Sequence, residues 1–225
     1  MRFRYRIRFR KVGDLRFIGH QDLARLWERI FRRAGLPLAM SEGFHPKARL
    51  SFPLSLPLGM EADEEVFEVQ LLERIDADVL RQSINAQCLP GLEATQVDAL
   101  PLQAPKAQVV RASYEAVVPS EHCAAVAQKL HQLMQQPHWP CVREDGRQVD
   151  IRPDIEVLTF QEGKLFFTLR HHHQAGARPR DVLAILGLDM ASQPQLLVRR
   201  TRVELIDAGA VPEPVVESGK DQHPS

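Results

Sequence analysis

The first ten residues alternate arginine with apolar side chains, and this alternation constrains the fold more than any other feature of the chain. Within residues 2–10 arginine stands at every even position, and Phe3, Tyr5, Ile7 and Phe9 stand between them. A period of two is typical of a β-strand, in which successive side chains point to opposite faces of the sheet. We therefore expect a strand with one apolar face packed on a core and one cationic face.

The cationic face of this strand needs a neutralising partner, because arginines two positions apart on a strand lie only about 6.6 Å from one another. The chain has a net charge of +0, but residues 1–50 carry 13 − 4 = +9 and residues 51–105 carry 2 − 10 = −8. Such segregation favours a basic surface for a polyanionic partner, for which we expect RNA. The alternative is that the two segments neutralise each other within one folded unit.

Apolar patterning predicts two halves with the same order of strand, helix, strand, strand, helix and strand. In the first half these elements are expected at 2–10, 20–34, 50–58, 65–72, 76–88 and 92–100. In the second they are expected at 111–118, 120–135, 155–160, 164–170, 178–186 and 196–205. This is the order of a ferredoxin-like unit. We therefore predict an α+β protein with two tandem ferredoxin-like (βαββαβ) domains, at 1–100 and 111–207, a linker at 101–110 and a disordered tail at 208–225.

The helix expected at 76–88 has a recognisable beginning. Asp76 is suited to cap its first free backbone N–H groups. The spacing of Val79, Leu80, Ile84 and Cys88 predicts that these four side chains face the core.

Further basic and polar side chains of the first half could join the strand in one phosphate-binding site. His20 lies at the start of an expected helix, where free backbone N–H groups can meet a phosphate. Hydroxyl, imidazole and ammonium groups of the Gly/Pro loop at 41–47 could contact phosphate oxygens. The candidate RNA-binding residues are Arg4, Arg6, Arg8, Arg25, Arg29, His20, Ser41, His45 and Lys47. A plainer interpretation is a solvated helix face beside a turn that only directs the chain.

No motif of a complete active site is present in the sequence: there is no Walker motif, GxGxxG, GxSxG or HExxH. The three cysteines, Cys88, Cys123 and Cys141, have no metal-binding spacing. The histidines at 171–173 would alternate between the faces of a strand and could not all bind one ion. We therefore expect no metal site. No apolar run reaches the length of a membrane span and no signal peptide is evident, so we expect a cytoplasmic protein without a membrane partner.

Five motifs stand in order along the first half, and together they are specific. They are Tyr5-Arg6-Ile7-Arg8-Phe9 with Lys11 and Gly13, Phe17-Ile18-Gly19-His20-Gln21-Asp22-Leu23, Arg32-Arg33-Ala34-Gly35-Leu36-Pro37, Ser41-Glu42-Gly43-Phe44-His45-Pro46 and Leu56-Pro57-Leu58-Gly59. This set resembles the bacterial radical-SAM-linked protein family, a domain of unknown function that is encoded beside, or fused to, a radical S-adenosylmethionine protein.

The resemblance implies an accessory subunit with a radical SAM protein as its partner. A radical SAM catalyst needs a CxxxCxxC triplet for its iron–sulfur cluster, and this chain has none. We therefore expect no cofactor in this chain, and S-adenosylmethionine and the cluster in the partner enzyme. Together with the charge pattern, this predicts an RNA-binding accessory protein that works in tRNA or rRNA modification.

Two alternatives stay open. The same motifs are more distantly similar to CRISPR repeat-processing endoribonucleases, although the Gly-rich loop that marks those enzymes near the C-terminus is missing. That similarity implies metal-independent cleavage with His20 or His45 as general acid or base, and Lys47 or Arg16 stabilising the phosphate charge. The second alternative is a pure protein–protein adaptor of the radical SAM partner, which docks through the acidic 61–78 region or the arginine face.

Overall fold

Both halves of the chain contribute strands to one mixed sheet. The computed structural model describes residues 1–171, 176–193 and 195–206. The first half forms β1 (Phe3–Lys11), the 3-10 helix η1 (Gly13–Phe17), α1 (His20–Arg33), β2 (Leu50–Ser51), β3 (Met60–Leu71), α2 (Ala77–Asn85) and β4 (Leu92–Leu100). The second forms β5 (Val109–Val117), α3 (Ser120–Met134), β6 (Pro140–Val142), β7 (Gln148–Asp150), the 3-10 helix η2 (Arg152–Asp154), β8 (Ile155–Gln161), β9 (Lys164–Arg170), α4 (Pro179–Ile185) and β10 (Leu197–Leu205). The α+β class is confirmed.

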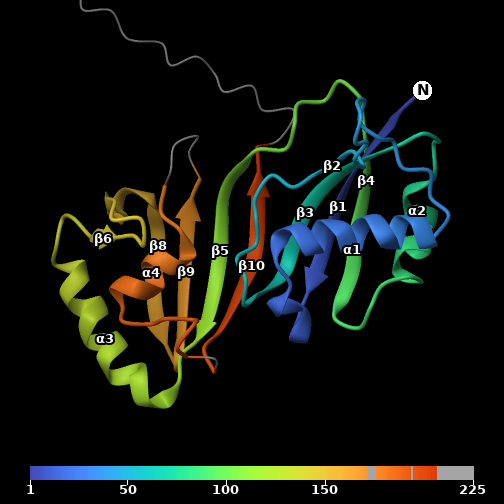
Figure 1. The fold of residues 1–225 in the computed structure, drawn as a ribbon. Coiled ribbons are helices and arrows are strands. Elements are labelled where there is room, and N and C mark those ends of the chain that lie inside the picture. The colour runs from blue at the N-terminus through green and yellow to red at the C-terminus, as the bar shows by residue number, and fades with distance from the viewer. Residues whose placement is uncertain (172–175, 194, 207–225) are drawn as a thin grey trace, which may run out of the picture.

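The sheet runs without a break from one half to the other in the order β4-β1-β3-β10-β5-β9-β8 (Figure 1). The strands within each half pair antiparallel, whereas β3 and β10 pair in parallel over Met60–Ala62 and Val198–Arg200. The short β2 pairs with the other end of β3, where Leu50 lies opposite Val69. The two halves are therefore joined along the first residues of β3.

The apolar face of β1 forms the base of the first core. Tyr5, Ile7 and Phe9 are buried beneath α1 and α2, as the alternation of residues 2–10 predicts. Trp27 of α1 packs on Phe67 of β3 with 4.8 Å between ring centroids. Both helices of the first half therefore cover one face of the sheet and leave the arginine face of β1 on the other side.

The second core lies under α3 and α4 and extends across the seam. It includes Phe167 of β9 and Val182 of α4, and also Met60 and Ala62 from the beginning of β3. Because residues of β3 belong to this core, the two halves share buried apolar surface as well as backbone hydrogen bonds.

The structure corrects several boundaries. The strand expected at 50–58 is reduced to Leu50–Ser51, because Pro53 and Pro57 lack the N–H groups that a ladder needs. Asp76 does cap α2, since its side chain accepts hydrogen bonds from the N–H groups of Asp78 and Val79, but Val79 is 53% exposed and does not face the core.

The second half adds a feature that apolar patterning did not predict, the β6–β7 hairpin. The expected linker also ends earlier than residue 110, because β5 begins at Val109. The predicted tail at 208–225 lies outside the described residues. Within the described ranges, no helix is long and apolar enough to cross a membrane.

Candidate functional site

The arginines at the start of β1 are bound to a glutamate of the neighbouring strand. Arg4 Nη2 lies 2.5 Å from one carboxylate oxygen of Glu68, and Arg6 Nη2 lies 2.9 Å from the other. Arg4 is only 7% exposed and also donates to the backbone carbonyl oxygens of Ala104 and Pro105. A phosphate would have to displace Glu68 to reach either guanidinium group.

The same compensation continues along β1. Arg8 pairs with Glu64 and also donates to the backbone oxygen of Val203 at 3.2 Å, and Arg10 Nε lies 3.5 Å from Asp63. Acidic side chains of β3 thus neutralise the cationic face that the sequence suggested for a polyanion. For Arg4, Arg6 and Arg8 the geometry favours the alternative in which the basic and acidic segments compensate each other within the fold.

The outer face of α1 is the basic surface that remains. Arg25 pairs with Asp22 at 3.2 Å and Arg32 with Glu28 at 2.5 Å, both within the helix. Arg29 and Arg33 are exposed and form no ion pair with any residue that the structure describes. Exposed pairs one helical turn apart contribute only a few tenths of a kcal/mol. The α1 face can therefore exchange its internal pairs for phosphate contacts.

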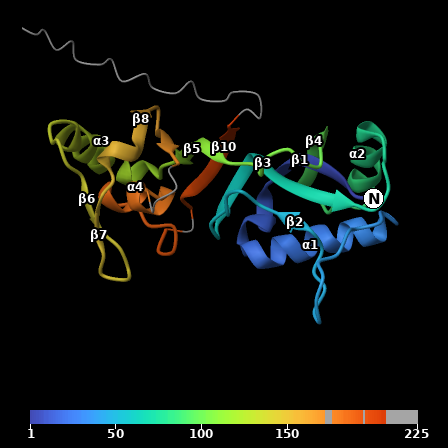
Figure 2. The same ribbon diagram turned by 90° about the horizontal axis from the view of Figure 1, so that it is seen from above.

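The loop between α1 and β2 stands out from the body of the protein beyond α1 (Figure 2). Ser41 closes this loop: its N–H donates to the carbonyl oxygen of Lys47 at 2.8 Å, and its hydroxyl accepts from the N–H of Lys47 at 2.9 Å. His45 and the side chain of Lys47 are exposed, and Phe44 is 102% exposed. Ser41 therefore shapes the loop, and its neighbours present an aromatic ring, an imidazole and an ammonium group to solvent.

His20 occupies a different environment from His45. Its ring stands edge-on to Phe52, with 5.0 Å between centroids, and its Nδ1 is buried without a hydrogen-bond partner among the described residues. Burial lowers the pKa of His20, so its imidazole is neutral at pH 7. The structure thus places the two histidines that sequence reasoning grouped together in separate settings, a partly buried helix start and an exposed loop.

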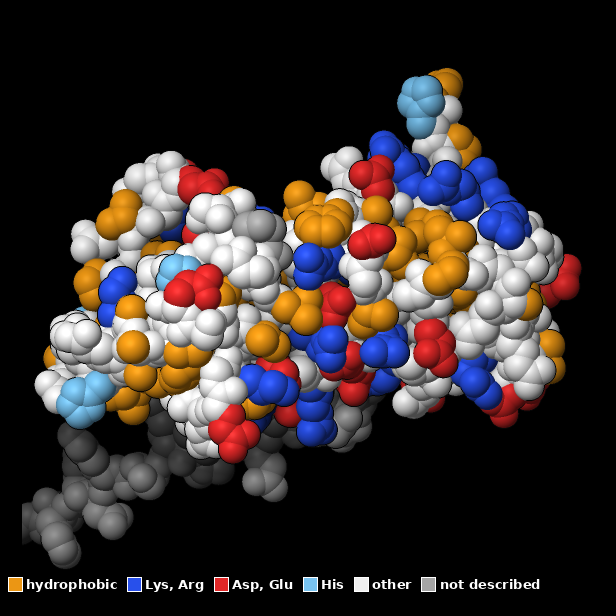
Figure 3. Space-filling view, turned by 90° about the horizontal axis from the view of Figure 1, so that it is seen from below, with side chains coloured by type: hydrophobic (Ala, Val, Ile, Leu, Met, Phe, Trp, Pro, Cys, Tyr) orange, Lys and Arg blue, Asp and Glu red, His pale blue; other side chains and the backbone are white. Residues whose placement is uncertain are grey.

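Lys and Arg side chains gather around a projection from the first half in the view from below (Figure 3). Histidine and apolar side chains lie at the tip of this projection. We define the α1/loop surface as Arg25, Arg29, Arg33, Phe44, His45 and Lys47. It retains four of the basic or imidazole side chains predicted for RNA binding, namely Arg25, Arg29, His45 and Lys47.

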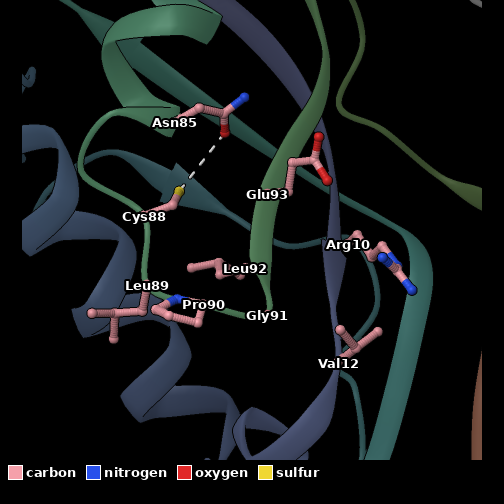
Figure 4. A pocket seen from close by; sticks show the side chains of 9 residues that line it. All are labelled: Arg10, Val12, Asn85, Cys88, Leu89, Pro90, Gly91, Leu92 and Glu93. Atoms are coloured by element: carbon pink, nitrogen blue, oxygen red, sulfur yellow. Dashed lines mark hydrogen bonds between the residues drawn. The ribbon is translucent and has the colours of Figure 1, made fainter.

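A pocket of about 460 Å³ lies at the other end of the first half, beside β4 and the end of α2. Cys88 points toward Asn85 there, with 3.8 Å between Sγ and Oδ1, and Arg10 lies across β4 from it (Figure 4). Burial raises the pKa of Cys88 to about 11. The thiol is therefore protonated at neutral pH and is a poor nucleophile.

No group of three or more His, Cys, Asp or Glu side chains that could hold a metal ion occurs in the part of the chain that the structure describes. His171 follows β9, and its backbone N–H donates to the carbonyl oxygen of Val110 at 2.7 Å. His172 and His173 lie outside the described residues.

Comparison with known proteins places the chain in a family. Residues 4–179 match the family described as uncharacterized protein conserved in bacteria (DUF2344). The chain belongs to this family. The DUF2344 match begins in β1 and ends at the start of α4, so it includes the whole α1/loop surface.

Other comparisons add little to the DUF2344 assignment. No curated protein matches the chain. The crystal structure of an unknown protein from Galdieria sulphuraria is similar with a TM-score of 0.28 and 8% identity, over 92% of this chain and 99% of that chain. A likeness of this size carries no weight for the fold or the function of this DUF2344 protein.

Sequence reasoning did not include two members of the α1/loop surface among its candidate residues. The sequence does not single out Arg33, because four arginines share the outward side of α1. Which of these four form ion pairs depends on side-chain rotamers, which a sequence does not show. Phe44 could have been found from the sequence, because it is an aromatic residue between Gly43 and Pro46 in an otherwise polar loop. No apolar periodicity requires an aromatic side chain there.

Proposed function

We propose that this protein binds RNA through the α1/loop surface and serves as an accessory protein of a radical SAM enzyme in tRNA or rRNA modification. The observation that carries the proposal is the position of two uncompensated arginines, Arg29 and Arg33, on a surface that also bears an aromatic ring exposed at the tip of a loop. Cations bind phosphates without regard to sequence, and exposed aromatic rings stack on unpaired bases.

The exposed ring of Phe44 is the strongest reason to consider RNA in particular. A side chain that is 102% exposed makes no contribution to the core, so its apolar surface is available for a partner. Stacking on aromatic side chains is the usual way in which proteins hold single-stranded loops and ends of RNA. Lys47, in the same loop, would contact the phosphate beside the stacked base.

The accessory role rests on the resemblance of five sequence motifs to radical-SAM-linked proteins. This chain has three cysteines and no CxxxCxxC triplet, so the iron–sulfur cluster and S-adenosylmethionine would be held by the partner enzyme. An RNA-binding surface and a separate catalyst together fit a protein that presents a nucleotide for modification.

We also propose that each half is a ferredoxin-like unit. The order β1-α1-β2-β3-α2-β4 gives the sheet order β4-β1-β3-β2, and β5-α3-β8-β9-α4-β10 gives β10-β5-β9-β8. Both orders are those of the split βαβ arrangement, with the β6–β7 hairpin inserted into the second unit. Under this interpretation the units are joined edge to edge through β3 and β10.

Sequencing of RNA crosslinked to the protein in cells tests the function directly. We expect enrichment of a small set of tRNA or rRNA positions, which should be lost when Arg29 and Arg33 are replaced by serine. Crosslinked RNA that merely reflects cellular abundance would contradict the proposal.

Copurification with and without nuclease separates RNA binding from a pure adaptor role. An adaptor should retain the radical SAM partner after nuclease treatment and show no bound RNA. Cleavage finds no comparable support in the geometry, since His20 packs on Phe52 and His45 lies on an exposed loop.

A further inference from the structure

A groove of about 860 Å³ lies at the seam between the two halves. Its walls come from η1, from the loop before β3, from the β6–β7 hairpin, and from α4 with the segment that leads to β10. In the view from below, the molecule is hollowed between its two lobes, with apolar, basic and acidic side chains intermixed at the centre of that face (Figure 3). This volume is typical of sites that hold small organic ligands.

Three arginines line the groove without a close ion pair, although each lies near enough to a carboxylate to lower its pKa: Arg16 that of Glu61, Arg178 that of Asp145 and Arg180 that of Asp189. Arg16, Arg178 and Arg180 form no ion pair with any described residue. Arg16 holds its guanidinium over the ring of Phe17, 4.7 Å from the centroid. The groove therefore presents cations from both halves of the chain.

The carboxylates of the groove are mostly compensated already. Asp145 is bound to Arg147 at 2.5 Å, and Asp181 is bound to the buried Arg143 at 2.8 Å. Asp189 accepts hydrogen bonds from backbone N–H groups of the loop that follows it. Glu144 remains without an ion pair among the described residues. The lining thus holds four arginines and four carboxylates, and two of these carboxylates, Asp145 and Asp181, are already held by ion pairs.

Apolar side chains on the same walls are exposed. Phe17 is 57% exposed and Leu58 is 50% exposed, although both are large enough to be buried in an ordinary core. An exposed aromatic ring beside guanidinium groups that are free of close ion pairs suits a ligand with a flat apolar part and an anionic part.

We propose that this groove binds one unpaired nucleotide of the RNA. Arg178 and Arg180 would hold the phosphate, and the base would lie against Phe17 and Leu58. The inference rests on the proposed function, which it deepens by naming where a target nucleotide lodges. η1, which supplies Arg16 and Phe17 to the groove, precedes α1 directly in the chain. An acidic peptide of a partner protein is the competing occupant.

Titration of the full chain with UMP and with AMP, followed by NMR of the backbone amides, tests the groove alone. We expect saturable shifts at Phe17 and Leu58 with millimolar affinity, and at least tenfold weaker binding after Arg178→Ser with Arg180→Ser. The matched control, Arg74→Ser with Arg81→Ser, removes two arginines at α2 that belong neither to the groove nor to the α1/loop surface, and it should bind UMP as the unmodified protein does.

Three results would overturn the inference. One is the absence of shifts in the groove residues, and another is an equal response to inorganic phosphate, which would remove the role of the base. The third is a peptide of alternating Glu and Leu that shifts the same amides at lower concentration than UMP. Failure of the proposed function can be told apart from failure of this inference. In the first case single-stranded RNA does not bind the α1/loop surface, whether or not UMP binds in the groove.

Discussion

The environment of each charged side chain in this protein depends on the face of the strand from which it projects. The period of two that places the arginines of β1 on one face also places Lys11 on the apolar side with Phe9, and the structure buries it there. Lys11, Glu65 and Arg200 are each 1% exposed at the seam. Arg200 Nη1 lies 2.6 Å from Glu65, and Arg200 Nε lies 3.2 Å from the hydroxyl of Tyr114. Breaking such a buried pair typically destabilises a protein by about 3–5 kcal/mol.

Lys11 gives this cluster a measurable pH dependence. Burial lowers the pKa of Lys11 from 10.5 to about 8. Between these values the unfolded chain holds a proton that the folded protein has lost, so the free energy of unfolding rises with pH by up to about 1.4 kcal/mol per unit. We expect Lys11→Met to lack this rise when urea unfolding is compared at pH 8 and pH 10. Lys129→Met, at an exposed site, should retain it, and equal pH dependence in both variants would show that Lys11 is not buried as a titrating group.

At the scale of elements, apolar periodicity predicts β1, α1 and β4 closely but not the partners of their charged faces. The arginine face of β1 was correctly assigned from alternation. Its neutralisation depends on register, which sets Arg6 opposite Glu68 across 62 residues of chain. Local patterns carry no information about such pairing. The loop at 41–47 was likewise predicted from Gly43 and Pro46, whereas its projection beyond α1 depends on how the helix packs.

Phe44 should contribute to RNA binding and nothing to stability. We expect Phe44→Ala to weaken binding of single-stranded RNA by about 1–3 kcal/mol, the usual contribution of a stacked base, and to leave the thermal midpoint unchanged. Fluorescence anisotropy with a labelled single strand measures the affinity. Val157→Ala removes an exposed apolar side chain from β8 and is the matched control. Equal affinities for the Phe44 and Val157 variants would exclude stacking on this ring.

At the scale of the molecule, the two halves that apolar patterning predicts share one sheet. The seam is built by β3 and β10, and Arg199 of β10 reaches Glu61 of β3 at 2.6 Å. The sequence pattern predicts two separate domains, because the residues of a strand do not show whether its free edge will form hydrogen bonds with a strand of the other half. Shared backbone hydrogen bonds and shared core residues favour cooperative unfolding.

Each half holds one tryptophan, which makes this cooperativity testable. Trp27 lies in the first core and Trp139 in the second, and both are buried. We expect the fluorescence transition of Trp139→Phe, which reports the first core, to coincide with the transition seen by far-ultraviolet circular dichroism. In Trp27→Phe the remaining Trp139 reports the second core, and its fluorescence transition should also coincide with the dichroism transition. A two-step dichroism curve with fluorescence following only one step would show that the halves unfold independently.

The dependence of RNA affinity on salt concentration tests whether the α1/loop surface binds the phosphates of RNA. For single strands, log K falls with log salt by about 0.7 for each phosphate contact. Replacing Arg25, Arg29 and Arg33 with serine should therefore lower the slope by about 2. The matched control replaces Arg81, Arg111 and Arg202, which are paired with carboxylates away from this surface, and should keep the slope of the unmodified protein. RNA affinity that does not change with ionic strength, or an unchanged slope in the α1 variant, would contradict phosphate binding by the α1/loop surface.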